Sequence, residues 1–558
     1  MTTAANGFTL GTYLVHRLEE AGVGHVFGVP GDYVLDFLDQ ITHSSLHWVG
    51  TCNELNAGYA ADGYARLHGL GAAVVTYGVG GFSILNAVAG AYAEQVPLVL
   101  ISGAPPALRR QTGAMMHHLT TDYLLQFDLF RKITVDSAML VNPQTAPDEI
   151  DRVLAACRTH QRPVYLELPM DMAQTPCRAP QPLVVAPLPA SHPEALAECV
   201  AEAARRLNAA QHPVVLAGVE LPRFGLAETA LRLIEKVELP YATTVGSKSA
   251  LPELHPQFVG LYQGALSRPA VRQEIETADC VLALGVWMTD FDTGGFSVKL
   301  DPSRLISANS ESVRIGFHTY PGVRLADFIA ALEPALTPRA FAASHPAHPM
   351  RMKGCFEVQP AAPLTVRRFF TRLDSFLNDD MILLVEPGDA VCAAPDLYIE
   401  EPENFIAQAY YLSIGYCTPA ALGASLARPR KRAVVLTGDG AFQMTAQEVS
   451  TLLRQHCPAI FFVLNNRGYM IERKLHADGP YNDIGNWQYH RLPEVLGGGA
   501  LTRRVTTEDE LEEAMTVALT ERDRLIFIEL CVPDGDCSAA LDALGEKFRA
   551  MSAAKSAT

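Results

Sequence analysis

The spacing of hydrophobic and polar residues predicts a repeated strand–turn–helix unit. In the N-terminal third, the short apolar run HVFGV (25–29) leads through a turn into the helix-like segment VLDFLDQI (34–41). Further apolar runs follow in LHWVGT (46–51) and PVYLELP (163–169). Near-continuous apolar strands alternating with helices are typical of parallel sheets that are covered on both faces. We therefore predict an α/β protein.

Two stretches rich in Pro and Ala divide the chain. QTPCRAPQPLVVAPLPASHPEA lies around 175–193, and LTPRAFAASHPAHPM covers 336–350. Such composition is typical of linkers between folded units. The predicted domains are therefore 1–180, 193–340 and 360–545. We expect each to be a doubly wound parallel-sheet domain, so the fold class is α/β throughout.

The composition is that of a globular protein, with 49% hydrophobic and 19% charged residues among 558. The net charge is −17, and the 44 Lys and Arg residues form no basic block. This charge balance argues against nucleic acid and anionic membranes as partners. A small anionic ligand would need a local positive site.

Cysteine usage and the N-terminus favour a cytoplasmic location. The 11 cysteines are dispersed without a CxxC pair, as expected for reduced thiols. The first residues lack a basic region followed by an apolar core, so no signal peptide is expected. The apolar segment 72–93 is long enough to span a bilayer, but glycines and polar residues interrupt it. We predict a buried strand and helix there.

Polar residues end two neighbouring predicted strands of the third domain. The strand RAVVLTGDG ends in the Gly-Asp-Gly of 438–440, and AIFFVLNN ends in Asn-Asn after another 24 residues. Open α/β sheets bind ligands at such carboxyl ends. Asp439 and Asn466 supply hard oxygens suited to Mg²⁺, and a backbone carbonyl at Gly468 would add a third. The glycines let backbone N–H groups approach a diphosphate.

This motif resembles the diphosphate and Mg²⁺ signature of thiamine diphosphate enzymes, and the domain order is similar to that of their 2-oxo acid decarboxylases. The resemblance implies pyrimidine-binding, middle and diphosphate-binding domains, with thiamine diphosphate and Mg²⁺ as cofactors. It implies metal coordination by Asp439, Asn466 and Gly468. The cofactor-binding residues that it implies are Glu54, Thr76, Asp389, Leu412, Ile414, Gly438, Asp439, Gly440 and Asn466.

The resemblance also assigns roles around the cofactor. Glu54, in TCNELNAGYAADGYAR, matches the glutamate that hydrogen-bonds the aminopyrimidine ring; by itself it would be an ordinary carboxylate at a helix start. Ile414 matches the bulky residue that bends the cofactor, although its type alone suggests a core position. The backbone near Leu412 would accept from the 4′-amino group. The implied chemistry runs through an ylid and an enamine, which belong to the cofactor.

The segment GAMMHHLTTDY (113–123) places two histidines side by side. Metal chelation by this pair is not expected, because adjacent side chains point apart on regular strands and helices. Asp32, His117, His118 and Glu472 match the decarboxylase residues that protonate the enamine and release the aldehyde. Such a cluster passes protons near neutral pH.

The histidine pair also separates subclasses of this scaffold. Acetolactate synthases are not expected to combine it with a glutamate six residues after Asn466, so the pair argues against the alternative of an acetolactate synthase-like carboligase. A more distant alternative is an inactive cofactor-binding scaffold, which would be expected to lose Glu54, the histidines or Asp439. TYGVGGFS (76–83) lacks the order G-x-G-x-x-G, so no dinucleotide site is predicted.

The substrate is predicted from a few wall positions. Pyruvate decarboxylases carry a bulky Trp where this chain has Val391, and Pro387 replaces their usual threonine. Phe291, Ile471 and Leu475 are the other expected wall residues. SIGY, ERKLH and YNDIGNW resemble indolepyruvate and phenylpyruvate decarboxylases. We predict conversion of an aromatic or bulky aliphatic 2-oxo acid to its aldehyde and CO₂, with pyruvate decarboxylation as the alternative.

The resemblance finally implies an assembly. The first three proton-transfer candidates lie in the N-terminal domain and Glu472 in the C-terminal one, so a cross-dimer site would draw them from two chains. We expect a homodimer with shared active sites, or a homotetramer built as a dimer of dimers. Arg223, in GVELPRFGL, resembles a regulatory arginine of phenylpyruvate decarboxylases. It would bind the carboxylate of a ligand at a second site, outside the active site, unless it is a plain surface residue.

Overall fold

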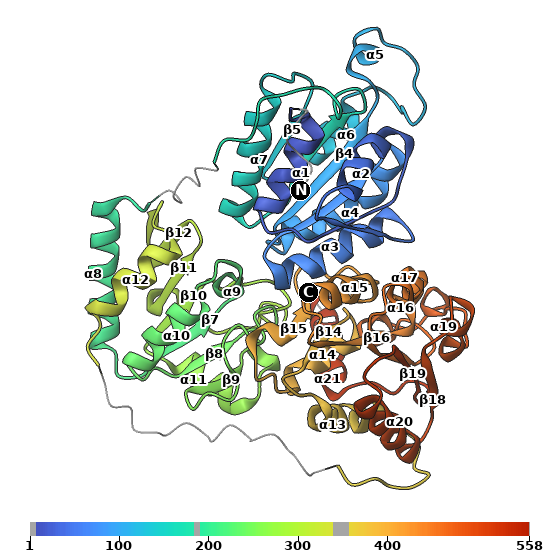
Figure 1. Cartoon of the computed structure of the whole chain (residues 1–558). Coiled ribbons are helices and arrows are strands. Elements are labelled where there is room, and N and C mark those ends of the chain that lie inside the picture. The colour runs from blue at the N-terminus through green and yellow to red at the C-terminus, as the bar shows by residue number, and fades with distance from the viewer. Residues whose placement is uncertain (1–6, 183–189, 339–355, 557–558) are drawn as a thin grey trace.

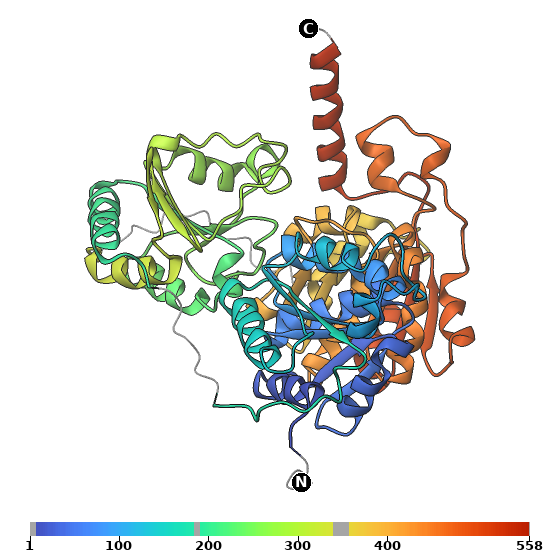
Figure 2. The same cartoon turned by 90° about the horizontal axis from the view of Figure 1, so that it is seen from above.

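The computed structural model describes residues 7–182, 190–338 and 356–556, and these ranges form three α/β units (Figure 1). In Figure 1 the N-terminal unit lies above the C-terminal unit (orange to red), with the middle unit (green) to one side; seen from above in Figure 2, the N-terminal unit overlaps the C-terminal unit and the middle unit stands beside them. Parts of both predicted linkers, 183–189 and 339–350, lie outside the described residues. Each unit has its own sheet. The predicted three-domain α/β fold is confirmed.

The N-terminal unit has a parallel sheet with strand order β2-β1-β3-β4-β6-β5. Its strands are β1 (His25–Gly28), β2 (His47–Gly50), β3 (Gly71–Val75), β4 (Leu98–Ala104), β5 (Asp136–Met139) and β6 (Val164–Pro169). Its helices are α1 (Leu10–Glu20), α2 (Leu35–Thr42), α3 (Glu54–His68), α4 (Val79–Ala93), α5 (Ala107–Gln111), α6 (Leu125–Phe130) and α7 (Ala146–His160). Strands β3 and β4 are buried throughout, as their apolar runs predict.

The C-terminal unit repeats this plan with strand order β15-β14-β16-β17-β19-β18, all parallel. Its strands are β14 (Met381–Val385), β15 (Phe405–Ala407), β16 (Arg432–Gly438), β17 (Ile460–Asn465), β18 (Leu501–Val505) and β19 (Ile526–Cys531). Its helices are α13 (Val366–Phe376), α14 (Asp389–Ala393), α15 (Cys417–Ala427), α16 (Asp439–Thr445), α17 (Val449–Arg454), α18 (Met470–Leu475), α19 (Leu492–Val495), α20 (Glu508–Thr520) and α21 (Ala539–Ser556).

The middle unit departs from the predicted all-parallel sheet. Its strand order is β13-β12-β11-β10-β7-β8-β9. At one edge, β12 pairs antiparallel with both of its neighbours, β11 and β13. The strands are β7 (Pro213–Ala217), β8 (Tyr241–Thr243), β9 (Phe258–Leu261), β10 (Cys280–Leu284), β11 (Leu305–Asn309), β12 (Ser312–Ile315) and β13 (His318–Pro321). The helices are α8 (Pro193–Ala209), α9 (Glu220–Arg223), α10 (Ala227–Lys236), α11 (Pro269–Thr277) and α12 (Leu325–Ala335). The links 310–311 and 316–317 are hairpins, because parallel neighbours need a crossover of about a dozen residues.

Two predicted segments take a more specific form. The apolar segment 72–93 divides into β3 and α4, and within the described ranges no helix is both long and apolar enough to span a membrane. The predicted Gly-Asp-Gly strand end is shared between two elements, because β16 ends at Gly438 and α16 starts at Asp439. The Gly-Asp-Gly motif therefore forms the strand-to-helix corner itself.

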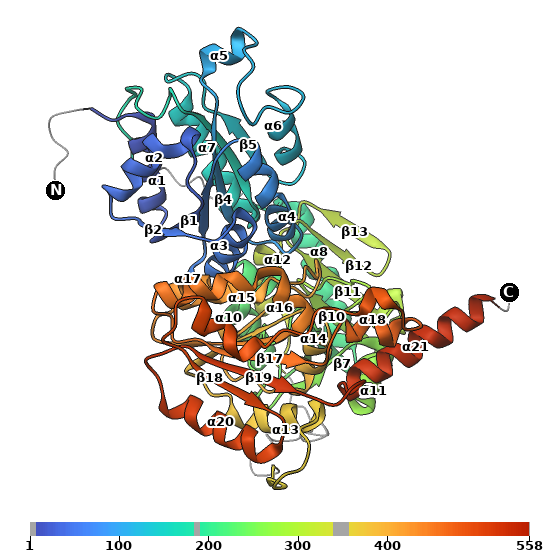
Figure 3. The same cartoon turned by 90° about the vertical axis from the view of Figure 1, so that its right-hand side faces the viewer.

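Helices α3 and α15 bring the N- and C-terminal units into direct contact, as Figures 1 and 3 both show. Their backbones approach through two glycines. A Cβ on Gly423 would lie 1.9 Å from the carbonyl oxygen of Ala60, and one on Gly63 would lie 2.4 Å from that of Ala420. Any larger residue at either position would collide with backbone atoms, so the glycines set the helix separation.

Polar contacts lie beside this helix pair. The buried Asp62 carboxylate accepts from the Tyr416 hydroxyl at 2.6 Å and pairs with Arg66 at 2.6 Å. The hydroxyls of Tyr59 and Ser413 lie 2.5 Å apart. The helix that begins with Glu54 is thereby bonded to the segment that leads into α15.

We expect Gly423→Ala to destabilise the fold. The added methyl group would meet the backbone of α3, and overpacking of this kind costs about 1–3 kcal/mol. The free energy of unfolding in urea should fall by at least that amount. Gly485→Ala is the matched control, because the nearest atom to its new methyl would lie 3.6 Å away on Trp487. Equal stability of the two variants would contradict the proposed tight contact.

Candidate active site

A cavity of about 350 Å³ opens at the carboxyl ends of the C-terminal sheet. Segments that follow β14, β16 and β17 form much of its wall, together with the turn before α15 and residues from the middle unit. Many of the sequence-predicted residues line it: Phe291, Asp389, Val391, Leu412, Ile414, Gly438, Asp439, Gly440, Asn466, Gly468, Ile471, Glu472 and Leu475. The fold therefore gathers the C-terminal candidates in one place.

Asp439 lies at the corner between β16 and α16 and is buried. Its Oδ1 accepts the backbone N–H of Gly440 at 2.8 Å. Its Oδ2 accepts those of Arg467 at 2.7 Å and Gly468 at 3.2 Å. Burial nevertheless raises the pKa of Asp439 to about 6, although these N–H groups favour the charged form. A cation at this corner would supply the missing counter-charge.

The side chain of Asn466 supports such a cation site. Its amide oxygen faces only other oxygens, at 3.0 Å from the carbonyl of Gly468 and 3.3 Å from Oδ1 of Asp439. Three acceptors in contact repel each other unless the amide turns its nitrogen inward or a cation lies among them. Two neighbouring oxygens about 2.1 Å from an octahedral Mg²⁺ are separated by about 3 Å. The residues present therefore fit the predicted metal.

The far wall of the cavity involves residues that the sequence did not single out. Leu544 and Phe548 of α21 line it, and α21 is tied to α18 by the Lys474–Asp542 ion pair at 2.7 Å. The carboxylate of Asp389 accepts from the backbone N–H of Ser538 at 3.0 Å, just before α21. The i, i+4 spacing of the two apolar residues indicated a buried helix face, but not what it would face.

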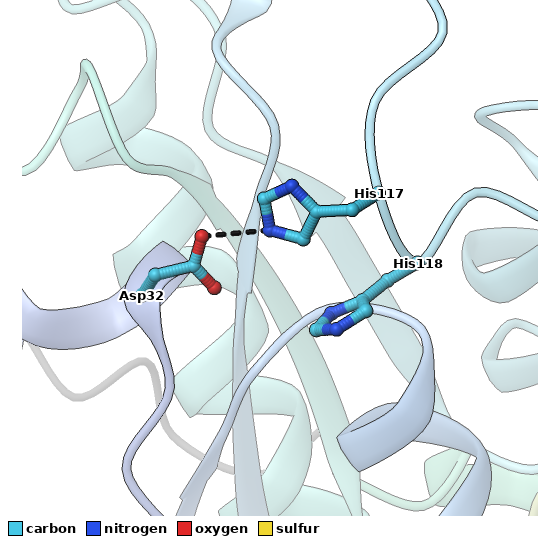
Figure 4. Close-up of side chains that lie close together, drawn as sticks. All are labelled: Asp32, His117 and His118. Atoms are coloured by element: carbon cyan, nitrogen blue, oxygen red, sulfur yellow. Dashed lines mark hydrogen bonds and ion pairs between the residues drawn. The ribbon is translucent and has the colours of Figure 1, made fainter.

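The N-terminal candidates form a second cluster (Figure 4). His117 Nε2 lies 2.7 Å from Oδ2 of Asp32, and its ring stacks on Tyr33 with centroids 4.7 Å apart. The His118 ring stands edge-on to His117, with centroids 4.7 Å apart. The expectation that the two histidines point apart is wrong, because His118 has φ +65° and the segment is neither strand nor helix. One ligand atom each from Asp32, His117 and His118 lies within 4.8 Å of the others, close enough for the three to bind one metal ion.

Glycines bring Glu54 and Thr76 towards this cluster. A Cβ on Gly80 would lie 3.3 Å from Glu54 Oε1 and 3.2 Å from Thr76 Cγ2. A Cβ on Gly78 would lie 2.4 Å from the carbonyl oxygen of His118. The string GVGG thus allows close approach of chemistry-bearing residues. Within the described part of the chain, Thr76 Oγ1 and His118 Nδ1 are among the buried polar atoms without a hydrogen-bond partner in the protein.

The two clusters do not meet within one chain. The cavity of the C-terminal unit is lined by residues from the middle and C-terminal units only, as far as the described residues show. Figures 1 and 3 both place α5, just before the histidines, at the end of the N-terminal unit remote from α16, and Figure 3 shows it remote from α18 as well. The cavity and the N-terminal cluster are therefore two separate candidate sites within one chain.

Arg223 lies apart from the N-terminal cluster and from the cavity, on α9 of the middle unit. It is half-buried, and its Nε donates to the carbonyl of Glu94 at 3.3 Å. Burial and the nearby Arg66 lower its pKa to about 10. Both arginines line a separate cavity of about 630 Å³. The carboxylate-binding role of Arg223 stays a prediction.

Comparisons with known proteins agree with this layout. The N-terminal, central and C-terminal domain models of thiamine pyrophosphate enzymes match residues 8–125, 200–333 and 388–530. An alpha-keto-acid decarboxylase of Mycobacterium avium (strain 104) is 40% identical over 94% of each chain. Proteins of the same name from Mycobacterium leprae (strain TN) and Mycobacterium tuberculosis (strain H37Rv) are each 39% identical. They cover 96% and 94% of this chain, and 95% and 94% of their own lengths.

We expect Asp439→Asn to weaken Mg²⁺-dependent binding of thiamine diphosphate by at least ~10-fold, measured by titration calorimetry. In the wild type, binding should weaken as the pH falls below about 6, because a proton then competes with the cation for Asp439. Asp290→Asn changes the charge of the same cavity on an exposed residue and should bind normally. Unchanged binding by the Asp439 variant would exclude it as a ligand.

Proposed function

The chain belongs to the thiamine diphosphate-dependent 2-oxo acid decarboxylases, and on this basis we propose that its substrate is an aromatic or bulky aliphatic 2-oxo acid. Indolepyruvate and phenylpyruvate are the representative substrates. The products are the corresponding aldehyde and CO₂. The carboxylate and ketone are common to all 2-oxo acids, so the pocket for the substrate side chain determines which acid is preferred.

The observation that supports this substrate class is the apolar wall of the cavity beside the metal corner. Val391, Ile471 and Leu475 supply small and aliphatic surfaces, and Phe291 and Phe548 supply aromatic ones. A valine in place of the tryptophan of pyruvate decarboxylases leaves room for a ring. Each methylene accommodated in such a pocket changes discrimination by about 1–3 kcal/mol.

Thiamine diphosphate would supply a nucleophilic carbon that attacks the ketone and a thiazolium ring that takes up the electron pair released with CO₂, and the protein would bind and orient it. Asp439, Asn466 and the Gly468 carbonyl would hold Mg²⁺ and, through it, the diphosphate. Ile414 would hold the cofactor bent. The backbone at Leu412, which has φ +56°, would accept from its amino group. The left-handed conformation supports a functional role, because non-glycine residues adopt it at a cost of about 1–3 kcal/mol.

Glu54 would hydrogen-bond the aminopyrimidine ring, and its place beside Gly80 and Thr76 supports this role. Asp32, His117 and His118 would move the proton that converts the decarboxylated intermediate into the aldehyde. The 2.7 Å contact between Asp32 and His117 supports proton sharing between them. Glu472, exposed at the cavity wall, would exchange protons from the opposite side.

The separation of the N-terminal cluster from the cavity within one chain supports a homodimer in which each active site combines two chains, with a homotetramer as the larger assembly. The N-terminal cluster of one chain would close the cavity of its partner. A cytoplasmic location is supported by the ten cysteines among the described residues, all of which are free thiols.

Pyruvate decarboxylation is the alternative within the same chemistry, and an acetolactate synthase-like carboligase is the alternative outside it. A carboligase must admit a second ketone in place of a proton donor. The hydrogen-bonded histidine cluster favours protonation. An inactive scaffold is disfavoured by the convergence of Asp439, Asn466 and Gly468 on one point.

Val391→Trp is expected to reverse substrate preference. The indole ring would fill the space proposed for the substrate side chain, so kcat/KM for indolepyruvate relative to pyruvate should fall by at least ~10-fold. Val391→Ala keeps the space open and should retain the preference for indolepyruvate. Aldehyde formation from indolepyruvate, phenylpyruvate, a branched-chain 2-oxo acid and pyruvate measures both variants. A wild-type preference for pyruvate would refute the proposed substrate class.

Glu54→Gln and Glu472→Gln should each abolish turnover while the protein stays folded. Mixed dimers, formed by co-expression with two affinity tags, should regain activity, because one of their two sites combines both wild-type residues. Random pairing predicts about a quarter of wild-type activity in the unfractionated mixture. If each site lay within one chain, every chain would carry one defect, and the mixture would stay inactive.

A further inference from the structure

Glu386 is a fully buried carboxylate at the end of β14, with 0% of its surface exposed. Its Oε1 accepts the backbone N–H groups of Gly415 at 2.8 Å and Tyr416 at 3.0 Å. Its Oε2 accepts that of Cys417 at 3.1 Å and lies 3.4 Å from the Thr437 hydroxyl. One side chain thus satisfies a run of successive backbone donors.

The groups bound by Glu386 belong to separate segments of the cavity wall. Residues 415–417 connect the turn of Leu412 and Ile414 to α15. Thr437 directly precedes the Gly438–Asp439 corner, and Glu386 itself precedes the wall residues 387–391. A single carboxylate therefore joins the segments that hold the two ends of the cofactor in the proposed function.

The energetic position of Glu386 points to function more than to stability. Within the described residues it forms no ion pair, and burial raises its pKa to about 7 despite its backbone donors. A buried carboxylate without a counter-charge is costly, so Glu386 depends on the hydrogen bonds that it accepts. The carboxylate is favourable only because it satisfies N–H groups at the start of α15, where negative charge is stabilised.

The turn itself needs an external constraint. Leu412 has φ +56°, a conformation that its side chain disfavours. Ser413 is held from the other side, by Tyr59 at 2.5 Å and by Gln408, which accepts its backbone N–H at 3.1 Å. Glu386 holds the exit of the turn, so the backbone between these contacts has little freedom.

We propose that Glu386 is a positioning residue for thiamine diphosphate: it holds the Leu412–Ile414 turn in its cofactor-binding conformation before the cofactor arrives. The inference rests on the proposed contact of this turn with the cofactor. Glu386 acts through the turn and does not touch the reacting atoms.

Glu386→Gln tests the proposal. The amide keeps two acceptor contacts but turns an N–H₂ towards the N–H of Cys417. The dissociation constant of thiamine diphosphate at saturating Mg²⁺ should rise on the order of tenfold. At saturating cofactor, the KM for the 2-oxo acid should stay unchanged. Glu508→Gln is the matched control, because Glu508 is 2% exposed in the same domain but pairs with Arg368. It should lower the melting temperature without changing cofactor affinity.

A rescue experiment separates positioning from general stability. Leu412→Gly removes the conformational penalty at φ +56°, so it should recover a large part of the cofactor affinity in the Glu386→Gln background. Leu412→Ala keeps the penalty and should not. Wild-type cofactor affinity in Glu386→Gln, or an equal loss of affinity in Glu508→Gln, would overturn the proposal.

Hydrogen exchange of the wild-type chain gives a test that needs no variant. The amides of Gly415, Tyr416 and Cys417 should be protected already in the cofactor-free protein. Protection that arises only with thiamine diphosphate and Mg²⁺ would overturn the role of Glu386. Ile414→Ala distinguishes the underlying assumption: if it binds cofactor and turns over normally, the proposed contact of the turn fails, independently of Glu386.

Discussion

The contact between α3 and α15 is the constraint on which the rest of the structure depends. Glycines at 63 and 423 let the two backbones approach until larger residues would collide. Glu54 begins α3, and the Leu412–Ile414 turn leads into α15. The separation of the two helices therefore sets the position of Glu54 relative to that turn within one chain.

Buried polar groups around the cavity are arranged in two ways. Asp439 and Glu386 are surrounded by backbone N–H groups, which fix their orientation before any ligand binds. Thr76 and His118 instead keep buried polar atoms without protein partners. The first kind of group gives preorganised geometry, and the second leaves hydrogen-bonding capacity for the substrate or cofactor.

Much of the site was accessible from the sequence because its residues follow apolar strands. Parallel strands place the residues at their carboxyl ends along one edge of the sheet. This rule predicts from the sequence alone that Asp439 and Asn466 lie close together. The same rule fails for residues that reach the cavity from a distant helix, as Leu544 and Phe548 do. Glu386 gives no signal in the sequence, since three backbone donors from another segment define its environment.

The sequence by itself determined the α/β units, the Gly-Asp-Gly corner and the residue types available for chemistry, because these depend on local periodicity and strand ends. Only the tertiary structure decided how the two histidines face each other, since His118 adopts a left-handed backbone that no regular pattern describes. It also decided that the N-terminal histidine cluster and the cavity of the C-terminal unit lie apart, because the packing of helices distant in sequence depends on surface shape. Local patterns carry no record of that shape.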